Sequence, residues 1–102
     1  MCVMKRYRKY DPNTVEAVQF TGENGEEIIN LLNVRGGTWI TRRRTFDKDV
    51  GEEVHEKVLT LEIIDRNGRC RAFQGDYILR EMNGDIYPVD EKSFLTSFEE
   101  IQ

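Results

Sequence analysis

The sequence predicts an α+β fold: a small antiparallel sheet made of two Asn-Gly hairpins and an N-terminal strand, with one short amphipathic helix packed on it. Two observations carry this prediction. Asn-Gly pairs at 67–68 and 83–84 each separate two runs of alternating apolar and polar residues, which is the pattern of a tight hairpin. Within 21–33 the apolar residues instead recur at helical spacing.

The size and composition of the chain indicate one soluble globular domain spanning residues 1–102. Two separate cores in 102 residues would each bury too little apolar surface. The chain is 38% hydrophobic and 33% charged, which is typical of a compact core with a solvated exterior. Cys2 and Cys70 are too few for a disulfide framework, and no window approaches the roughly 18 apolar residues of a membrane span. We therefore expect reduced thiols, no membrane association and a cytoplasmic location.

The first two elements are a strand and a helix. Residues 13–20, "NTVEAVQF", alternate as a strand that we expect at the centre of the sheet. The helix that follows carries Ile28 and Leu32 on its apolar stripe. Asn24 is placed to cap its N-terminus, with Glu27 as the reciprocal member of a capping box.

The middle of the chain holds a basic strand and an acidic segment. Residues 38–46, "TWITRRRTF", alternate as a strand with Trp39 on one face and Arg42 on the other. Residues 47–56, "DKDVGEEVHE", show no periodicity and are rich in carboxylates. We predict that this segment is a mobile acidic loop within the domain.

The first hairpin should contribute a core face. If Asn67-Gly68 forms a two-residue type I′ turn, Arg66 pairs with Arg69 and Ile63 lies opposite Ala72. The residues that then share one face are all apolar: Leu59, Leu61, Ile63 and Ala72.

The second hairpin and the C-terminal segment are interpreted in the same way. The turn at 83–84 should pair Arg80 with Tyr87 and Ile78 with Val89, with Asp85 as a turn residue. Gly75 and Asp76 provide the bend between the hairpins, and Pro88 suggests an edge strand. Asp90 should cap one further helical turn, which brings in Phe94 and Phe98 as core anchors.

The residue types offer little for catalysis or metal binding. The single histidine, His55, lies in the predicted loop with no fixed relation to Cys70, whereas nucleophilic catalysis needs an oriented base beside its nucleophile. One histidine and two distant cysteines cannot complete a zinc shell, and the acidic segment lacks the EF-hand spacing. We predict a protein that is not an enzyme and has no catalytic residues, metal or cofactor.

Two groups of residues are candidate binding sites. Trp39, Arg42, Arg43 and Arg44 offer forked donors and a stacking face to a phosphate, a carboxylate or another anionic partner. Alternation separates them onto two faces, so a small-ligand site would draw on a second strand or on a second subunit of a homo-oligomer. The competing interpretation is a basic edge strand that guards against aggregation. Glu52, Glu53 and Glu56 form the second group, which would occupy a basic surface on another protein.

The charge distribution argues against nucleic acid as a general partner. Residues 1–44 carry a net charge of +3 and residues 45–102 a net charge of −7. "KRYRKY", residues 5–10, interleaves cations with tyrosines as nucleic-acid contacts do. The overall net charge of −4 argues against broad nucleic-acid affinity, so we interpret 5–10 as a basic N-terminal arm.

Two blocks of the chain carry a family resemblance. "YRKYDPNTVEAVQFTGENGEEIINLL" and "GDYILREMNGDIYPVDEKSFLTSFEEI" resemble a widespread set of small, functionally uncharacterised bacteriophage and prophage proteins. The shared pattern is YRK, VEA and QFTG near the start, then GDYI, NGD, YP and a Phe near the end. Residues 34–58 have no counterpart in that pattern, and Val89 stands where family members often have a cysteine.

The resemblance implies a phage accessory protein that acts in the host bacterial cytoplasm. The leading hypothesis is an anti-CRISPR-like inhibitor that binds a host defence protein through Glu52, Glu53 and Glu56. One alternative is a sponge that sequesters a phosphorylated nucleotide signal with Trp39, Arg42 and Arg44. The other is a structural or assembly protein of the virion.

Overall fold

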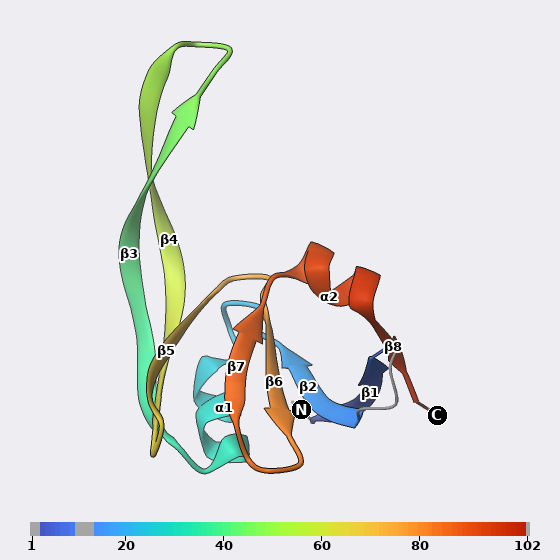
Figure 1. The fold of residues 1–102 in the computed structure, drawn as a ribbon. Coiled ribbons are helices and arrows are strands. Elements are labelled where there is room, and N and C mark those ends of the chain that lie inside the picture. Colours follow the sequence, from blue (N-terminus) through green and yellow to red (C-terminus); the bar gives the residue numbers. More distant parts are fainter. Residues whose placement is uncertain (1–2, 10–13, 102) are drawn as a thin grey trace.

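The fold combines two antiparallel sheets with two short helices in the computed structural model, which describes residues 3–9 and 14–101 (Figure 1). The first sheet has the strand order β7-β6-β2-β1-β8, and the second has the order β3-β4-β5. The first sheet contains β1 (Lys5–Lys9), β2 (Thr14–Gln19), β6 (Tyr77–Glu81), β7 (Ile86–Val89) and β8 (Phe98–Glu100). The second contains β3 (Arg35–Asp47), β4 (Glu52–Asp65) and β5 (Gly68–Phe73), and the helices are α1 (Gly25–Leu32) and α2 (Glu91–Ser97).

The α+β class is confirmed, but the single sheet and single helix of the prediction are wrong. The two Asn-Gly hairpins belong to different sheets, since β4 and β5 lie in one and β6 and β7 in the other. Segment 5–9 is not a free basic arm. It forms β1, where Arg6 pairs with Glu16 of β2 and Tyr7 with Glu100 of β8. Tyr10 lies outside the described residues, as does Cys2.

The positions of two strands in the first sheet follow the predictions. β2 is the middle strand of its sheet, and β7, which contains Pro88, is at one edge. An edge strand tolerates proline because one side of its backbone has no strand to pair with.

Two buried clusters hold these elements together. The larger joins α1 to both sheets through side chains that include Phe20, Ile28 and Leu61, all fully buried. Leu61, Ile63 and Ala72 are fully buried and Leu59 packs against the cluster that contains them, so the core face predicted for the first hairpin is confirmed.

The smaller cluster places α2 on the first sheet. The ring of Phe94 stacks on Tyr77 with centroids 3.9 Å apart and on Phe98 at 4.9 Å. Phe94 and Phe98 are both buried, which confirms them as anchors. Asp90 caps α2 as predicted, because its carboxylate accepts a hydrogen bond from the backbone N–H of Ser93.

The N-cap of α1 differs from the prediction in its chemistry. Asn24 occupies the N-cap position, but its side chain does not bond a helical N–H. Its Oδ1 accepts from the N–H of Thr21 at 2.9 Å, and its Nδ2 donates to the carbonyl of Gln19 at 2.8 Å. The amide therefore fixes the approach of the chain to α1.

The register of the first hairpin is wrong by two residues. Asp65 pairs with Gly68, so Ile63 lies opposite Cys70 and Leu61 opposite Ala72. The cause is an Asx turn, in which Asp65 Oδ1 accepts from the N–H of Asn67 at 2.8 Å. Positive φ then falls on Gly68, whereas a type I′ turn would need it at Asn67 as well. A shift of two residues preserves the faces of a strand, so the core face is unaffected.

The register of the second hairpin is wrong by one residue. Arg80 pairs with Ile86 and Ile78 with Pro88. The loop is longer than two residues, because the N–H of Glu81 bonds the carbonyl of Asp85 and the N–H of Asp85 bonds Asn83 Oδ1. Asp85 is thus a turn residue, as predicted.

Gly75 and Asp76 form the predicted bend between β5 and β6. Asp76 Oδ2 accepts from the N–H of Phe73 at 2.8 Å, and the N–H of Asp76 donates to the carbonyl of Phe73 at 2.9 Å. Gly75 has a φ of 99° and donates to the carbonyl of Phe20. The bend therefore also ties β2 to the chain that leaves β5.

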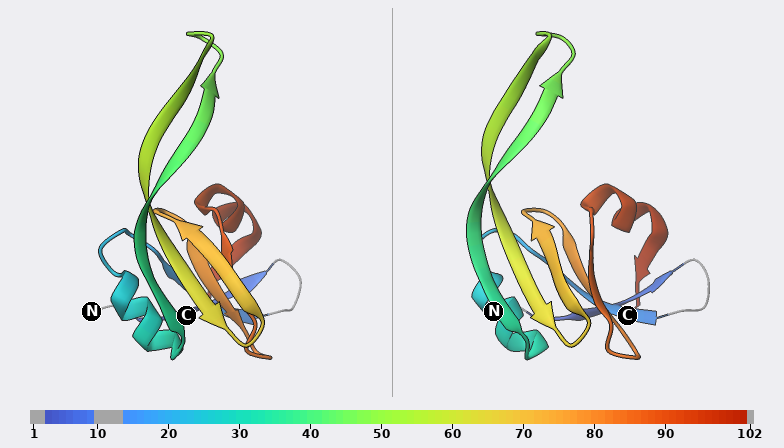
Figure 2. Two further views of the ribbon diagram at one scale, coloured as in Figure 1. Left: turned by 90° about the vertical axis from the view of Figure 1, so that its left-hand side faces the viewer. Right: turned by 60° about the vertical axis from the view of Figure 1, so that its left-hand side comes forward.

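The strands β3 and β4 extend far beyond the rest of the protein as a twisted two-stranded ribbon (Figures 1 and 2). β5 pairs only with residues 60–65 of β4, so residues 40–59, here called the arm, have strand partners only within the arm. The predicted loop over 47–56 is wrong in extent: Glu52 to Glu56 belong to β4, and the turn covers 48–51. Residues 52–56 form a strand although their sequence lacks periodicity, because each of them pairs with a residue of β3.

Candidate functional site

The arm brings the two predicted groups of binding residues together in one hairpin. In its register Arg42 lies opposite Lys57, Arg44 opposite His55, and Phe46 opposite Glu53. Residues directly opposite each other share a face, so these side chains, together with Ile40, form what we call the basic face. Arg42, Arg44 and Lys57 outnumber the single carboxylate there.

The other side of the arm, the acidic face, has the opposite balance. Arg43 lies opposite Glu56, and Asp47 lies opposite Glu52. Thr41, Thr45, Val54 and Val58 complete this side. The arginines and glutamates that the sequence offers as alternative sites therefore fall mainly on opposite faces of one ribbon, with Arg43 and Glu53 as the exceptions.

Ion pairs follow the same division into faces. Glu56 Oε1 accepts from both Nη2 and Nε of Arg43, at 2.6 and 3.1 Å. On the basic face, Glu53 lies 4.0 Å from Arg44 and 3.5 Å from His55. All of these side chains are substantially exposed, so each pair adds little stability. Within the described residues, no ion pair or hydrogen bond engages the side chain of Arg42.

The arm also exposes large apolar side chains. Ile40 is 71% exposed and Phe46 66%, both on the basic face, and Val50 in the turn is 62% exposed. Val54 is partly exposed on the acidic face. These large apolar side chains are therefore in contact with water at several positions along the arm.

Trp39 stands at the base of the arm on the same face as Arg43, away from Arg42 and Arg44. It is opposite Thr60 in the register, and Thr60 is in turn opposite Phe73. The guanidinium of Arg43 lies over the ring of Phe73, 5.6 Å from its centroid, which is within cation–π range. The four predicted ligand-binding residues therefore do not converge within one protomer.

Cys70 and His55 do not come together in the structure, since Cys70 lies opposite Ile63 of β4 and His55 lies on the arm opposite Arg44. Burial, and then the charge of Asp65, raise the pKa of the Cys70 thiol, which is the opposite of activation. His55 Nε2 lies 3.5 Å from a carboxylate oxygen of Glu53 on the arm. Across residues 3–9 and 14–101, no three or more His, Cys, Asp or Glu side chains are grouped so that they could hold a metal ion.

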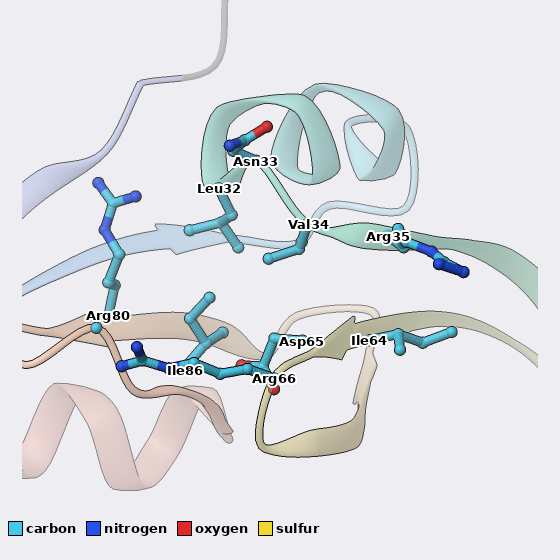
Figure 3. Close-up of a pocket in the computed structure, with 10 residues that line it drawn as sticks. Leu32, Asn33, Val34, Arg35, Ile64, Asp65, Arg66, Arg80 and Ile86 are labelled. Carbon is cyan, nitrogen blue, oxygen red and sulfur yellow. The ribbon is translucent and has the colours of Figure 1, made fainter.

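The structure contains a cavity that the sequence interpretation missed (Figure 3). It has a volume of about 710 Å³ and lies between the end of α1 and the turns of both Asn-Gly hairpins. Its apolar lining comes from Leu32, Val34, Ile64 and Ile86, and its cationic lining from Arg35, Arg66 and Arg80. These residues are scattered over the chain, and no local motif links them.

Comparison with protein-family models, curated proteins and solved structures finds no match. In the described part of the chain, no helix has the length and apolar character to cross a membrane.

Proposed function

We propose that this protein is a non-enzymatic binding protein that uses the arm to bind a partner protein. The observation that carries the proposal is the exposure of Ile40, Phe46 and Val50 on a two-stranded ribbon that has no core of its own. An isolated two-stranded hairpin is only marginally stable in water. A partner that covers these side chains would remove apolar surface from water and stabilise the ribbon.

The charge of the arm supports a protein partner over a polyanion. The arm carries five Lys or Arg residues and five Asp or Glu residues. A nucleic-acid surface would repel the acidic face, since it is recognised chiefly through its phosphates. A protein surface of mixed charge can match both faces.

The identity of the partner rests on the resemblance to small phage and prophage proteins. On that basis we propose an anti-defence role in the host cytoplasm, in which the arm binds and inhibits a bacterial antiviral protein, as anti-CRISPR proteins do. The proposed acidic contacts are Glu52, Glu53 and Glu56, of which Glu52 and Glu56 share the acidic face.

A second candidate, an anion-binding sponge, is favoured by one feature of the basic face. Arg42 and Lys57 are directly opposite each other, and like charges in that position destabilise a strand pair. A bound phosphate would relieve this repulsion. Because Trp39 lies on the other face, a stacked nucleotide would need a second subunit to complete the site.

Photo-crosslinking tests whether the arm is the interface. A photoreactive amino acid at position 46 of the arm should crosslink to a protein in infected host cells, whereas the same group at position 95, on the exposed surface of α2, should not. Ile40→Ser in the position-46 protein should abolish the adduct. Equal crosslinking from positions 46 and 95 would contradict an arm interface.

Phage plating tests the anti-defence role. Host strains carrying defined CRISPR or other antiviral systems should plate a targeted phage better when they express the protein. Glu52→Lys with Glu56→Lys should remove this protection if the partner is a basic protein surface, whereas Arg42→Ala with Arg44→Ala should remove it if the protein sequesters a phosphorylated signal. If the protein protects the phage in none of these strains, the anti-defence role is refuted. The crosslinking experiment would then still decide whether the arm binds a protein.

A further inference from the structure

We infer that the cavity between the two hairpin turns is a binding site for a small amphiphilic anion, a molecule with an apolar body and a carboxylate or phosphate group. This site is separate from the arm and does not depend on the function proposed for it. Its volume of about 710 Å³ falls within the range of small-molecule sites.

The apolar part of the cavity is formed by side chains that face each other across it. Figure 3 shows Leu32 and Val34 on one wall of the cavity, with their side chains pointing toward Ile86 on the other wall. Val34 and Ile86 pack against the larger core cluster, so they form a fixed surface. Such a surface would take up an aromatic or aliphatic body.

The charged part of the cavity is strongly unbalanced. Arg35, Arg66 and Arg80 line it, with Asp65 as the single carboxylate. Asp65 Oδ1 already accepts a hydrogen bond from the N–H of Asn67. Cations grouped around a concave surface attract anions, and the planar fork of an arginine suits a carboxylate or phosphate.

Arg66 is held in place before any ligand arrives. Its Nη2 donates to the carbonyl of Asn83 at 3.0 Å, which links the turn of one hairpin to the turn of the other. A second link joins the same turns, because Asn67 Nδ2 donates to Asp85 Oδ1 at 2.9 Å. A guanidinium fixed through one nitrogen keeps its other donors for a ligand at a reduced entropic cost.

The other two arginines extend the charge along the cavity. Figure 3 shows Arg80 and Arg35 toward opposite ends. Arg80 is paired with Glu16 at 3.1 Å, and no ion pair engages Arg35 among residues 3–9 and 14–101. Arg66 with Arg80 forms the more ordered end, and we place the anionic group of the ligand there.

Two pairs of probes test the site by ¹H–¹⁵N NMR of the full chain. AMP and 2-naphthoate carry the anion, and adenosine and 2-naphthylmethanol are their neutral counterparts. We expect AMP, 2-naphthoate or both to shift the amides of Val34, Ile64 and Gly84, with the neutral counterparts at least about tenfold weaker. A response to AMP alone identifies a phosphate ligand, and a response to 2-naphthoate alone identifies a carboxylate ligand.

Substitutions of single arginines then identify which of them bind the anionic group of the ligand. Arg66→Gln and Arg80→Gln should each weaken anion binding by about tenfold, whereas Arg69→Gln, an exposed arginine on β5 outside the cavity, should not. Unshifted amides in α2 would show that each variant is folded. Arg35→Gln is a variant that removes a charge from the lining without breaking any ion pair among residues 3–9 and 14–101. Failure of both anions to shift these amides, equal binding of the neutral probes, or an equal loss with Arg69→Gln would overturn the inference.

Discussion

Two neighbouring glycines at the start of β3 should respond in opposite ways to the same substitution. A Cβ on Gly36 would lie 1.9 Å from the carbonyl oxygen of Glu62 and 3.0 Å from Ile29 Cδ1, and Gly36 has a φ of 147°. A Cβ on Gly37 would meet nothing nearer than a Trp39 ring atom at 4.0 Å. Gly36→Ala should therefore destabilise the fold strongly, and Gly37→Ala should not.

The expected size of the effect at Gly36 has two parts. Backbone strain at a φ that disfavours side chains costs about 1–3 kcal/mol, and a methyl group forced against fixed backbone costs about 1–3 kcal/mol more. A loss of roughly 2–6 kcal/mol is a large part of the roughly 5–15 kcal/mol by which a domain is stable. Gly37→Ala should change the free energy of unfolding by less than about 1 kcal/mol, with stabilisation favoured by the lower entropy of the unfolded chain.

Urea unfolding followed by far-UV circular dichroism measures both free energies. Gly36→Ala should lower the midpoint with little change in slope, since a change in slope would signal a different unfolded or native compactness. Equal effects of the two substitutions, or a Gly36→Ala variant within about 0.5 kcal/mol of the parent, would refute the close approach of β3 to β4 and α1 at this point.

Three further predictions follow from other parts of the fold. Phe94→Ala should cost about 3–5 kcal/mol of unfolding free energy, whereas Leu95→Ala at its exposed neighbour should change it by less than about 0.5 kcal/mol in the same urea assay. A double-mutant cycle on Arg43 and Glu56, measured by thermal unfolding, should give a coupling free energy below about 1 kcal/mol that decreases in high salt. A larger coupling free energy would mean that the arm is stiffer than its exposure indicates. Burial and the hydrogen bond to Glu81 raise the pKa of Tyr87 to about 12. The folded state therefore retains the Tyr87 proton at pH values above the unfolded pKa of about 10. The stability that this proton contributes is present below pH 10 and is lost as the pH rises through 12. Tyr87→Phe should reduce that loss in a series of unfolding measurements at alkaline pH.

Local patterns were sufficient to predict the faces of the strands but not their register. Alternation placed Leu61 and Ile63 correctly in the core, because a face depends only on the parity of the position. Register depends on the turn, and Asp65 starts the first turn with an Asx hydrogen bond that moves the loop. An aspartate two residues before the asparagine of an Asn-Gly pair is a signal that could have corrected the register.

The extent of the arm could not be predicted from periodicity. Residues 52–56 contain Val54 between the polar residues Glu53 and His55 and lack an alternating apolar face, because neither face of that part of the ribbon is buried. The strand exists because β3 supplies a partner for every backbone group of one edge. A basic strand followed by an acidic one of similar length is the cue in this sequence, since opposite charges come into register when the chain folds back.

The cavity could not be predicted from local sequence patterns for a different reason. Arg35, Arg66 and Arg80 line one cavity although they come from β3, the β4–β5 turn and β6, and the turns of the two hairpins, which lie in different sheets, are hydrogen-bonded to each other. Neither hairpin by itself specifies this contact. The Asn-Gly turns that the sequence indicated as architecture also anchor Arg66 at the cavity, through its hydrogen bond to the carbonyl of Asn83.

The two halves of β4 differ in how much they contribute to the core. Residues 60–63 are buried between the strands on either side, whereas 52–57 are exposed over their whole length. Substitutions at Glu53 or Glu56 remove no core contact and should leave the free energy of unfolding nearly unchanged, while substitutions at Leu61 or Ile63 should lower it by several kcal/mol, about 2–5 for truncation to alanine. The arm is therefore the part of this protein where sequence can change with little cost to the fold, which is the property that a surface adapted to a particular partner requires.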